Sequence, residues 1–498
     1  MHRRRLPALC AAAILWVLLP GPAAAQDPLP GPVLQALQQA DLPAEALAAV
    51  ALPLDGSRWL RPWQHRAQVA MQPASTMKLV TSIVALDRLG PNHRGHTELR
   101  SAAALAGGTL LGDLVLKGGA DPELGVPQFW ALLLDLRQAG VTHIAGNLLV
   151  DRSLFRPARF DQGLPPFDES PEFPYNVIPD ALLLAGNLLP LEIRAGPTGV
   201  DAAVVPPLPG LEVSSAMTLG ERACSDWDDD WKPARVWQQD GRTRVELNGA
   251  FPRGCTQRAA LQLIDRQELA GRLFRALWQG LGGTWAGNAV EQAAPEGTRV
   301  LARRQSRPWG EVLRHLNKTS DNALTRLLFL ELGVPAMASE PQATTRELAD
   351  RAVRQWLAGH GIGDQGLVLD NGSGLSRSER ITPWQLASML RVAHAGRHAA
   401  ELVMSLPVAG VDGGLRRRFV DSPAAGWARL KSGTLRNVVS LAGYVQDSDG
   451  RPWAVAMMIN HERAGTARPV LDALVDHIAR HGPHGPAGVH SGPLSDGP

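Results

Sequence analysis

Hydrophobic residues recur at helical spacing near the start of the chain and again over its last third. In the first of these segments, apolar side chains from Met77 to Leu86 share one helix face, and Gly90 follows as a stop signal. We therefore expect a buried helix there. Similar patterns predict further helices over 309–316, 322–332, 346–360, 383–395 and 469–480.

The stretch between residues 96 and 290 has a different texture, with short apolar runs separated by Gly, Pro and Asp. Such runs are typical of strands bounded by turns. We expect strands over 110–116, 146–150, 188–193, 202–205 and 244–247, and helices over 129–139 and 266–281. This pattern predicts a β-rich inserted region with two subdomains.

Apolar runs near both ends of the chain predict hairpins. Residues 46–54 and 58–60 flank a turn at 55–57, and residues 437–445 and 453–459 flank a turn at 447–450. The chain is therefore predicted to have a mixed α/β core built from early and late segments and split by the insertion. The expected boundaries are 26–95 for the first part of the core, 96–290 for the insertion and 291–480 for the second part.

Residues 1–25 predict an export signal, because three arginines at 3–5 precede an apolar run at 6–19 and a small-residue cleavage site ending at Ala25. The run is short for a membrane span. We therefore expect a periplasmic or otherwise exported protein without a transmembrane anchor. Residues 481–498 are rich in Gly, Pro and His and predict a disordered tail.

The charge balance argues against one class of partner. Lys and Arg number 50 against 48 Asp and Glu, so the net charge of +2 gives no basis for nucleic-acid binding. Arginine dominates the basic residues, which leaves few lysines: Lys78, Lys117, Lys232, Lys318 and Lys431. Because arginine cannot lose its proton in a protein, a lysine that persists in such a chain is a candidate for a position that needs a group able to lose its proton.

Two cysteines remain after the export signal, Cys224 and Cys255. In an oxidising compartment a disulfide that closes this segment is favoured over a metal site. We expect neither a metal nor a cofactor.

Candidate chemistry begins with Ser75 and Lys78, three residues apart at the start of the first predicted helix. On a helix they share a face, so their side chains can meet. A desolvated lysine has a lowered pKa and can remove the serine proton. Taken alone, the pair also fits a capping serine followed by a solvated lysine.

Two later stretches favour the catalytic interpretation. Ser320-Asp321-Asn322 opens a predicted helix, and Lys431-Ser432-Gly433-Thr434 opens a predicted strand. With Ser-x-x-Lys, they match the three signatures of penicillin-binding proteins and serine β-lactamases, with Ser432 where threonine is usual.

The spacing of the motifs favours one branch, because the gap from Ser75 to Ser320 is more than twice the gap from Ser320 to Lys431. From Ala46 to about Arg480, the sequence resembles the class C low-molecular-mass penicillin-binding proteins, the D-alanyl-D-alanine carboxypeptidase/endopeptidase family. Secondary motifs that agree lie at 116–122, 146–155, 370–377 and 406–415. The resemblance implies a β-lactamase/transpeptidase-like domain, an antiparallel sheet flanked by helices.

The resemblance also implies the catalytic roles. Ser75 is the expected nucleophile and Lys78 the expected base. Ser320 passes a proton to the leaving amine, Lys431 supplies a fixed positive charge, and Asn322 hydrogen-bonds the substrate amide.

Binding roles follow from the same resemblance. The backbone N–H groups of Ser75 and Thr434 are the expected oxyanion donors. The hydroxyl of Ser432 is expected to bind the substrate carboxylate, and Gly433 leaves room for the substrate along the strand edge.

The resemblance also implies that three further residues recognise the diamino acid of the substrate. In the family, the positions of Asp151 and Phe155 lie against the cleft, and that of Arg377 helps to bind a carboxylate. From the residues alone, Asp151 can instead cap a turn and Phe155 can be core. Lys318 either supports the site or is solvated.

These features predict an exported serine DD-peptidase that acts on peptidoglycan stem peptides and on cross-bridges of D-Ala linked to a diamino acid, with β-lactams as covalent inhibitors. Two alternatives stay open: a β-lactamase or esterase on the same scaffold, and a peptidoglycan-binding protein without catalysis. Tyr175-Asn176 resembles part of the class C β-lactamase Tyr-x-Asn motif, but it falls within the insertion.

Overall fold

The computed structural model describes residues 26–55 and 60–485. The predicted export signal, most of the predicted tail and residues 58 and 59 of the expected N-terminal hairpin lie outside these ranges. Within the ranges, no helix is long and apolar enough to cross a membrane.

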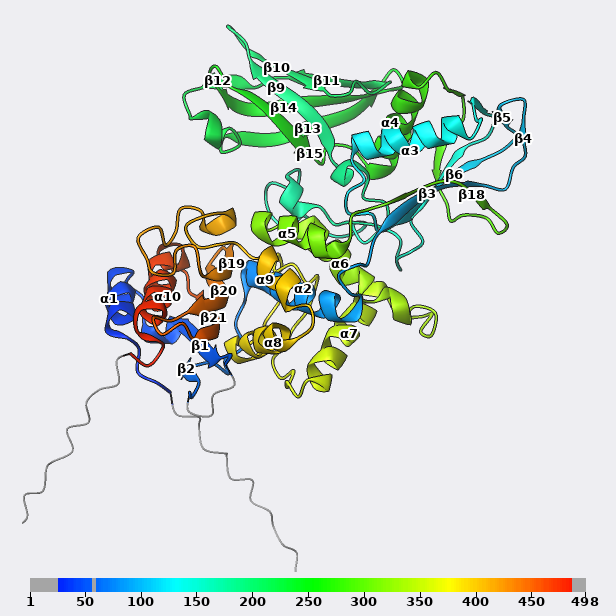
Figure 1. The fold of residues 1–498 in the computed structure, drawn as a ribbon. Coiled ribbons are helices and arrows are strands. Elements are labelled where there is room, and N and C mark those ends of the chain that lie inside the picture. The colour runs from blue at the N-terminus through cyan, green and yellow to red at the C-terminus, as the bar shows by residue number, and fades with distance from the viewer. Residues whose placement is uncertain (1–25, 56–59, 486–498) are drawn as a thin grey trace, which may run out of the picture.

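A five-stranded antiparallel sheet joins the two ends of the chain (Figure 1). Its order is β19 (Arg429–Leu435), β20 (Val438–Gln446), β21 (Pro452–Asn460), β1 (Leu47–Pro53) and β2 (Trp63–His65). Because β1 pairs with β21, the first strand of the chain lies beside the last. The predicted mixed α/β core of early and late segments is confirmed.

Helices cover both faces of this sheet. Side chains alternate along β1, so Ala48 and Val50 pack into one cluster while Leu47 and Ala49 pack into another. The first cluster is covered by α2 (Met77–Arg88) and α8 (Pro383–Ala395), and the second by α1 (Gly31–Gln39) and α10 (Arg468–His481). Four more helices extend the first side: α5 (Trp309–Thr319), α6 (Asn322–Glu331), α7 (Thr345–Gly359) and α9 (Ala399–Ser405).

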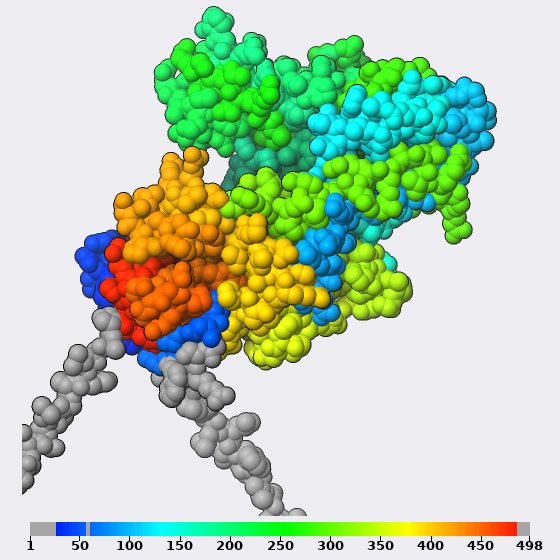
Figure 2. Space-filling view, viewed as in Figure 1, coloured from blue at the N-terminus to red at the C-terminus, as the bar shows by residue number. Residues whose placement is uncertain are grey.

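The insertion forms a lobe beside α5 and α6 (Figure 1), and Figure 2 shows a hollow between this lobe and the orange part of the core. The first sheet of the insertion has the order β17 (Ala289–Glu291), β8 (Leu148–Asp151), β6 (Leu114–Gly119), β3 (His96–Ser101) and β18 (Arg299–Gln305). Because β18 pairs with β3, the sheet of the insertion continues beyond residue 290.

Three smaller sheets complete the lobe. One has the order β16 (Thr284–Trp285), β7 (His143–Ile144), β5 (Thr109–Leu110) and β4 (Leu105–Ala106); the second has β10 (Val200–Val204), β9 (Leu189–Ala195) and β15 (Thr256–Leu261). The third has β11 (Leu211–Ser215), β14 (Arg242–Pro252) and β12 (Thr218–Gly220), with β13 (Trp231–Gln239) beside β14. With α3 (Val126–Gln138) and α4 (Arg266–Gly280), their buried side chains form one hydrophobic cluster.

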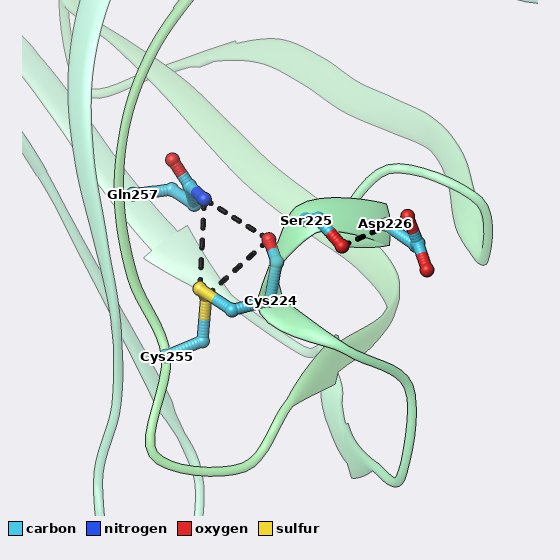
Figure 3. Close-up of a disulfide and its surroundings, with 5 residues drawn as sticks. All are labelled: Cys224, Ser225, Asp226, Cys255 and Gln257. Atoms are coloured by element: carbon cyan, nitrogen blue, oxygen red, sulfur yellow. Dashed lines mark hydrogen bonds between the residues drawn. A yellow bond between two sulfur atoms is a disulfide. The ribbon is translucent and has the colours of Figure 1, made fainter. Parts of the chain in front are cut away.

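Cys224 and Cys255 form the predicted disulfide (Figure 3). The bond joins the short turn η5 (Cys224–Asp226) to the segment that precedes β15. It therefore closes the part of the insertion that contains β13 and β14.

Aromatic rings connect this closed segment to the core-facing side of the insertion. The rings of Trp227 and Trp231 lie edge to face, and Phe173 packs against both. Tyr175 stacks on Phe173 with ring centroids 6.3 Å apart. The turn that carries Tyr175 is thus supported from the disulfide-closed segment.

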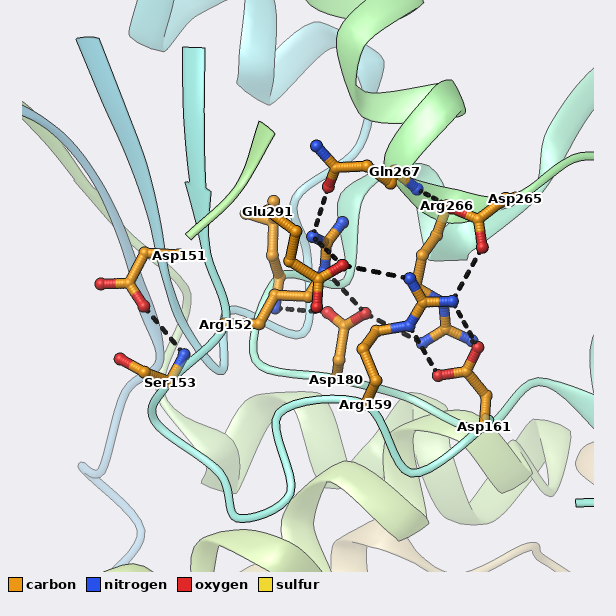
Figure 4. A network of polar contacts seen from close by, with 11 residues as sticks. Asp151, Arg152, Ser153, Arg159, Asp161, Asp180, Asp265, Arg266, Gln267 and Glu291 are labelled. Atoms are coloured by element: carbon orange, nitrogen blue, oxygen red, sulfur yellow. Dashed lines mark hydrogen bonds and ion pairs between the residues drawn. The ribbon is translucent and has the colours of Figure 1, made fainter. Parts of the chain in front are cut away.

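Buried ion pairs fix the segment that leaves β8 (Figure 4). The guanidinium of Arg152 donates to Asp180 at 3.1 Å, and that of Arg266 donates to the same carboxylate at 2.9 Å. Arg159 pairs with Asp161 and Asp265. Because Arg266 and Asp265 lie at the start of α4, the loop over residues 152–180 is anchored to that helix.

Candidate active site

Ser75 lies in a 3₁₀ turn, η2 (Ala74–Thr76), directly before α2, and not within the helix itself. The turn is tight, since Ala74 has a φ of 46°, which residues other than glycine seldom adopt. The carbonyl of Pro73 accepts hydrogen bonds from Thr76 Oγ1 at 2.7 Å and Ser440 Oγ at 2.5 Å. Strand β20 therefore holds the turn against the sheet.

Lys78 is fully buried on α2, and its amine faces three oxygen atoms. The Nζ atom donates to Ser75 Oγ at 3.0 Å, Asn322 Oδ1 at 2.6 Å and the carbonyl of Ser373 at 2.6 Å. Burial, together with the nearby charge of Lys431, holds the pKa of Lys78 well below its usual range. An amine in this state can accept the proton of the adjacent serine.

The second motif forms the break between two helices. Helix α5 ends at Thr319, and Ser320 follows it with a left-handed φ of 61°. Asp321 caps α6 by accepting the N–H of Leu324 at 2.8 Å. This turn directs two side chains toward the two lysines of the site. Lys431 Nζ donates to Ser320 Oγ at 2.9 Å, while Asn322 accepts from Lys78.

The third motif lies on the edge strand β19. Lys431 is 2% exposed, and burial lowers its pKa to about 7. At Gly433 a Cβ atom would overlap Ser440 Oγ and would lie only 2.7 Å from the backbone nitrogen of Ser75. Only glycine therefore allows β19 to approach the Ser75 turn. Ser432 is partly exposed and Thr434 is exposed beside it.

The structure thus brings the three predicted motifs together. One hydroxyl, on Ser75, faces the buried amine of Lys78, and a second hydroxyl, on Ser320, faces the buried amine of Lys431. Two hydroxyl–amine pairs in one site can move one proton from a nucleophile and deliver another to a leaving group.

Backbone carbonyls also bond to side chains of the site, and no sequence motif indicates them. The carbonyl of Ser373 accepts from Lys78, and the carbonyl of Tyr175 accepts from Asn322 Nδ2 at 3.0 Å. Tyr175 comes from the insertion, in the turn η3 (Pro174–Asn176). The insertion therefore orients a side chain of the site directly.

Lys318 pairs with the carboxylate of Asp412, and its side chain is only 14% exposed. Asp412 also accepts the N–H of Val408 at 2.9 Å, which holds the loop before β19. A Cβ atom at Gly414 in that loop would lie 2.9 Å from Ser432 Oγ. Lys318 thus supports the backbone next to the third motif.

Asp151 and Phe155 are not brought into contact with the Ser75 group. The oxygens of Asp151 accept the N–H groups of Ser153 at 2.8 Å and Ala294 at 3.0 Å, and Lys117 pairs with it at 3.2 Å. Figure 4 shows the carboxylate turned toward Ser153. Asp151 has no exposed surface and Phe155 is 2% exposed within the core. This geometry favours their structural alternatives, and a role in recognition stays a prediction.

Arg377 is exposed and lines a pocket of about 640 Å³. Its guanidinium lies over the ring of Phe167, 5.3 Å from the centroid. The same pocket contains Arg326, one helical turn beyond Asn322 on α6, and Asn176, next to Tyr175. The pocket therefore adjoins the residues that orient Asn322.

Comparisons with known proteins identify the family of the chain and relatives of it. A sequence profile of the D-Ala-D-Ala carboxypeptidase 3 (S13) family matches residues 31–480. The chain is 28% identical over 430 residues to a D-alanyl-D-alanine carboxypeptidase of Actinomadura sp. (strain R39), covering 83% of this chain and 77% of that protein. It is 26% identical over 412 residues to the D-alanyl-D-alanine carboxypeptidase DacB of Haemophilus influenzae, covering 80% and 83%.

The fold is also shared with a solved structure. The crystal structure of penicillin binding protein 4 from Haemophilus influenzae matches with a TM-score of 0.74 and 24% identity. The match covers 90% of this chain and 99% of that one, so the insertion belongs to the shared fold as well as the core.

Proposed function

The chain belongs to the D-Ala-D-Ala carboxypeptidase 3 (S13) family, and on that premise we propose that it is an exported serine DD-peptidase. It removes the terminal D-alanine from peptidoglycan stem peptides and opens cross-bridges in which D-alanine is linked to a diamino acid. Both reactions proceed through an acyl-enzyme on Ser75.

One contact carries the proposal: the 3.0 Å hydrogen bond between Lys78 Nζ and Ser75 Oγ in a fully buried environment. Burial and the charge of Lys431 disfavour the protonated form of Lys78 and hold its pKa well below its usual range, which favours the neutral amine that the proposed base requires. The hydroxyl of Ser75 passes its proton to this amine as it attacks the substrate carbonyl.

The oxyanion that forms needs fixed donors. The N–H group of Ser75 lies against β19 where Gly433 comes closest, and Thr434 follows on the same strand. These two N–H groups are the proposed oxyanion hole. Gly433 is required because a side chain there would push the strand away from Ser75.

The leaving amine needs a proton. Ser320 Oγ is the proposed donor, and the ammonium of Lys431, 2.9 Å from it, replaces that proton. Water then hydrolyses the ester on Ser75. In a β-lactam the departing nitrogen stays attached to the acyl group after the ring opens, so the same attack is expected to leave a long-lived adduct.

The substrate is held on both sides of the reacting bond. Ser432 binds the terminal carboxylate at the edge of β19, and Asn322 binds the peptide amide. Arg377 binds the carboxylate of the diamino acid from the adjoining pocket.

Digestion of defined muropeptides tests the proposal. Uncross-linked pentapeptide and cross-linked dimer are incubated with the protein, and the products are read by mass spectrometry. We expect loss of D-alanine from the first and monomers from the second, and no product from the Ser75→Ala variant. Ser339→Ala, which removes an exposed serine hydroxyl, is the matched control and should retain activity.

Other outcomes distinguish the alternatives. Rapid release of penicilloate from the acylated protein would indicate a β-lactamase. Binding to sacculi without any product would indicate a binding protein that lacks catalysis.

A further inference from the structure

Glu379 carries a buried carboxylate that binds the loop in contact with Lys78. The side chain has no exposed surface. Its Oε1 atom accepts the backbone N–H groups of Asp370, Asn371 and Gly372 at 3.2, 3.0 and 2.8 Å, and Oε2 accepts that of Gly374 at 2.9 Å. An ionised carboxylate only accepts hydrogen bonds, so these four donors match the charged form.

The loop that Glu379 gathers contacts both the nucleophile and the base. Its Ser373 carbonyl accepts the amine of Lys78 at 2.6 Å. At Gly374, where φ is +83°, a Cβ atom would overlap the carbonyl of Ala74 and lie 2.8 Å from the backbone nitrogen of Ser75. The position of this loop therefore sets the position of the Ser75 turn.

The loop has a second, uncharged anchor on the helix of the lysine. Thr81 Oγ1, one turn beyond Lys78 on α2, donates to the carbonyl of Gly372 at 2.8 Å. Thr81 is fully buried. Glu379 holds the loop with a charged group and Thr81 holds it with an uncharged one. Variants at these two residues therefore separate the effect of charge on Lys78 from the effect of the loop's position on Lys78.

We propose that Glu379 is a positioning residue for the base: its carboxylate holds the loop that places the carbonyl of Ser373 on the amine of Lys78, and its negative charge acts on that amine. The inference rests on the proposed function, because it concerns how Lys78 acts in acylation. In the described residues, the carboxylate of Glu379 accepts only from the loop over 370–374, and Glu379 does not line the pocket of Arg377.

The charges around Lys78 shift its pKa in opposite directions. Burial and the positive charges of Lys431 and Arg326 lower its pKa, whereas Glu379 and Asp321 raise it. Burial in turn raises the pKa of Glu379, as does the neighbouring Asp370, while the N–H donors lower it. Removing the charge of Glu379 therefore shifts the pKa of Lys78 further downward.

The test is the pH profile of acylation by a chromogenic β-lactam in wild type and in Glu379→Gln. The variant keeps an oxygen for three N–H donors but leaves that of Gly374 without an acceptor. We expect the plateau rate to fall about tenfold and the acid limb, on which Lys78 gains its proton, to move to lower pH.

Two further variants isolate the causes. Glu379→Asp keeps the negative charge on a shorter side chain. We therefore expect its plateau rate of acylation to be lower than that of wild type, and its acid limb to lie closer to the wild-type pH than the acid limb of Glu379→Gln does. Thr81→Val loosens the same loop without altering charge, and its acid limb is expected to stay at the wild-type pH.

The possible failures are distinct. If wild type forms no adduct at any pH, the proposed function and this inference both fall. If wild type is acylated but Glu379→Gln keeps the wild-type acid limb, or Thr81→Val shifts it equally, this inference alone is overturned. Should Glu379→Gln not fold, a wild-type plateau rate in Glu379→Asp overturns the anchoring role.

Discussion

Replacing Gly433 by alanine should disable acylation while leaving the fold largely intact. The added Cβ would overlap Ser440 Oγ and would lie 2.7 Å from the nitrogen of Ser75 and 2.9 Å from the carbonyl oxygen of Pro73. The hydroxyl of Ser440 cannot easily move, because it donates to that same carbonyl at 2.5 Å. The two backbone contacts belong to the Ser75 turn itself. Strand β19 and the turn must therefore separate.

The size of the effect follows from these contacts. Overpacking of one methyl group costs about 1–3 kcal/mol of stability. A displacement approaching 1 Å between the nucleophile and its oxyanion donors costs about 100-fold in rate. Stability is measured by chemical unfolding, and acylation by stopped-flow fluorescence with a fluorescent penicillin.

Two companion variants make the test specific. Gly359→Ala adds the same methyl group at the end of α7, where nothing lies within 4 Å, and should be neutral or stabilising by up to about 1 kcal/mol. Adding Ser440→Ala to Gly433→Ala removes the hydroxyl overlap but not the backbone contacts, so stability should recover in part while acylation stays slow. Wild-type acylation and stability in Gly433→Ala would refute this reasoning.

Three other predictions concern separate parts of the molecule. The acylation rate constant of the free enzyme should have a bell-shaped dependence on pH, because it rises as Lys78 loses its proton and falls above about pH 7 as Lys431 loses its proton. Stopped-flow measurements across pH test this prediction, and a flat profile would count against a role for the two lysines. Replacing Cys224 and Cys255 by serine should destabilise the insertion by about 2–4 kcal/mol in urea unfolding, and unchanged unfolding would show that the disulfide is dispensable. Arg377→Ala should raise the KM for peptides bearing a diamino acid about tenfold while leaving acylation by benzylpenicillin unchanged, and an equal loss with both substrates would contradict a recognition role.

The side-chain chemistry of the site was accessible from the sequence because it depends on residue type. A hydroxyl on Ser75 or Ser320 and an amine on Lys78 or Lys431 cannot be supplied by most other residues, so their spacing is informative. The structure confirms the mixed α/β core and brings these four side chains into two hydrogen-bonded pairs.

The contributions of Ser373 and Tyr175 could not be predicted in the same way. Each supplies a backbone carbonyl, which every residue type has, so only the path of the chain reveals it. The likeness of Tyr175-Asn176 to part of a Tyr-x-Asn motif does not indicate this contact, since the backbone carbonyl of Tyr175, and not its phenol, accepts from Asn322. Glu379 was missed because its partners are backbone N–H groups of a loop.

Local sequence patterns also could not predict which strands pair across the insertion. Residues 299–305 alternate weakly, yet β18 pairs with β3 about two hundred positions earlier. Such a partner is fixed by tertiary packing, which sequence periodicity does not encode.

We propose that Ser75 is the nucleophile and that Lys78 activates it. The most direct measurement is intact-protein mass spectrometry after benzylpenicillin treatment, followed by peptide mapping of the adduct. We predict one penicilloyl group, located on Ser75, in wild type and none in Ser75→Ala. An adduct on another residue, or labelling that survives Ser75→Ala, would show that Ser75 is not the nucleophile.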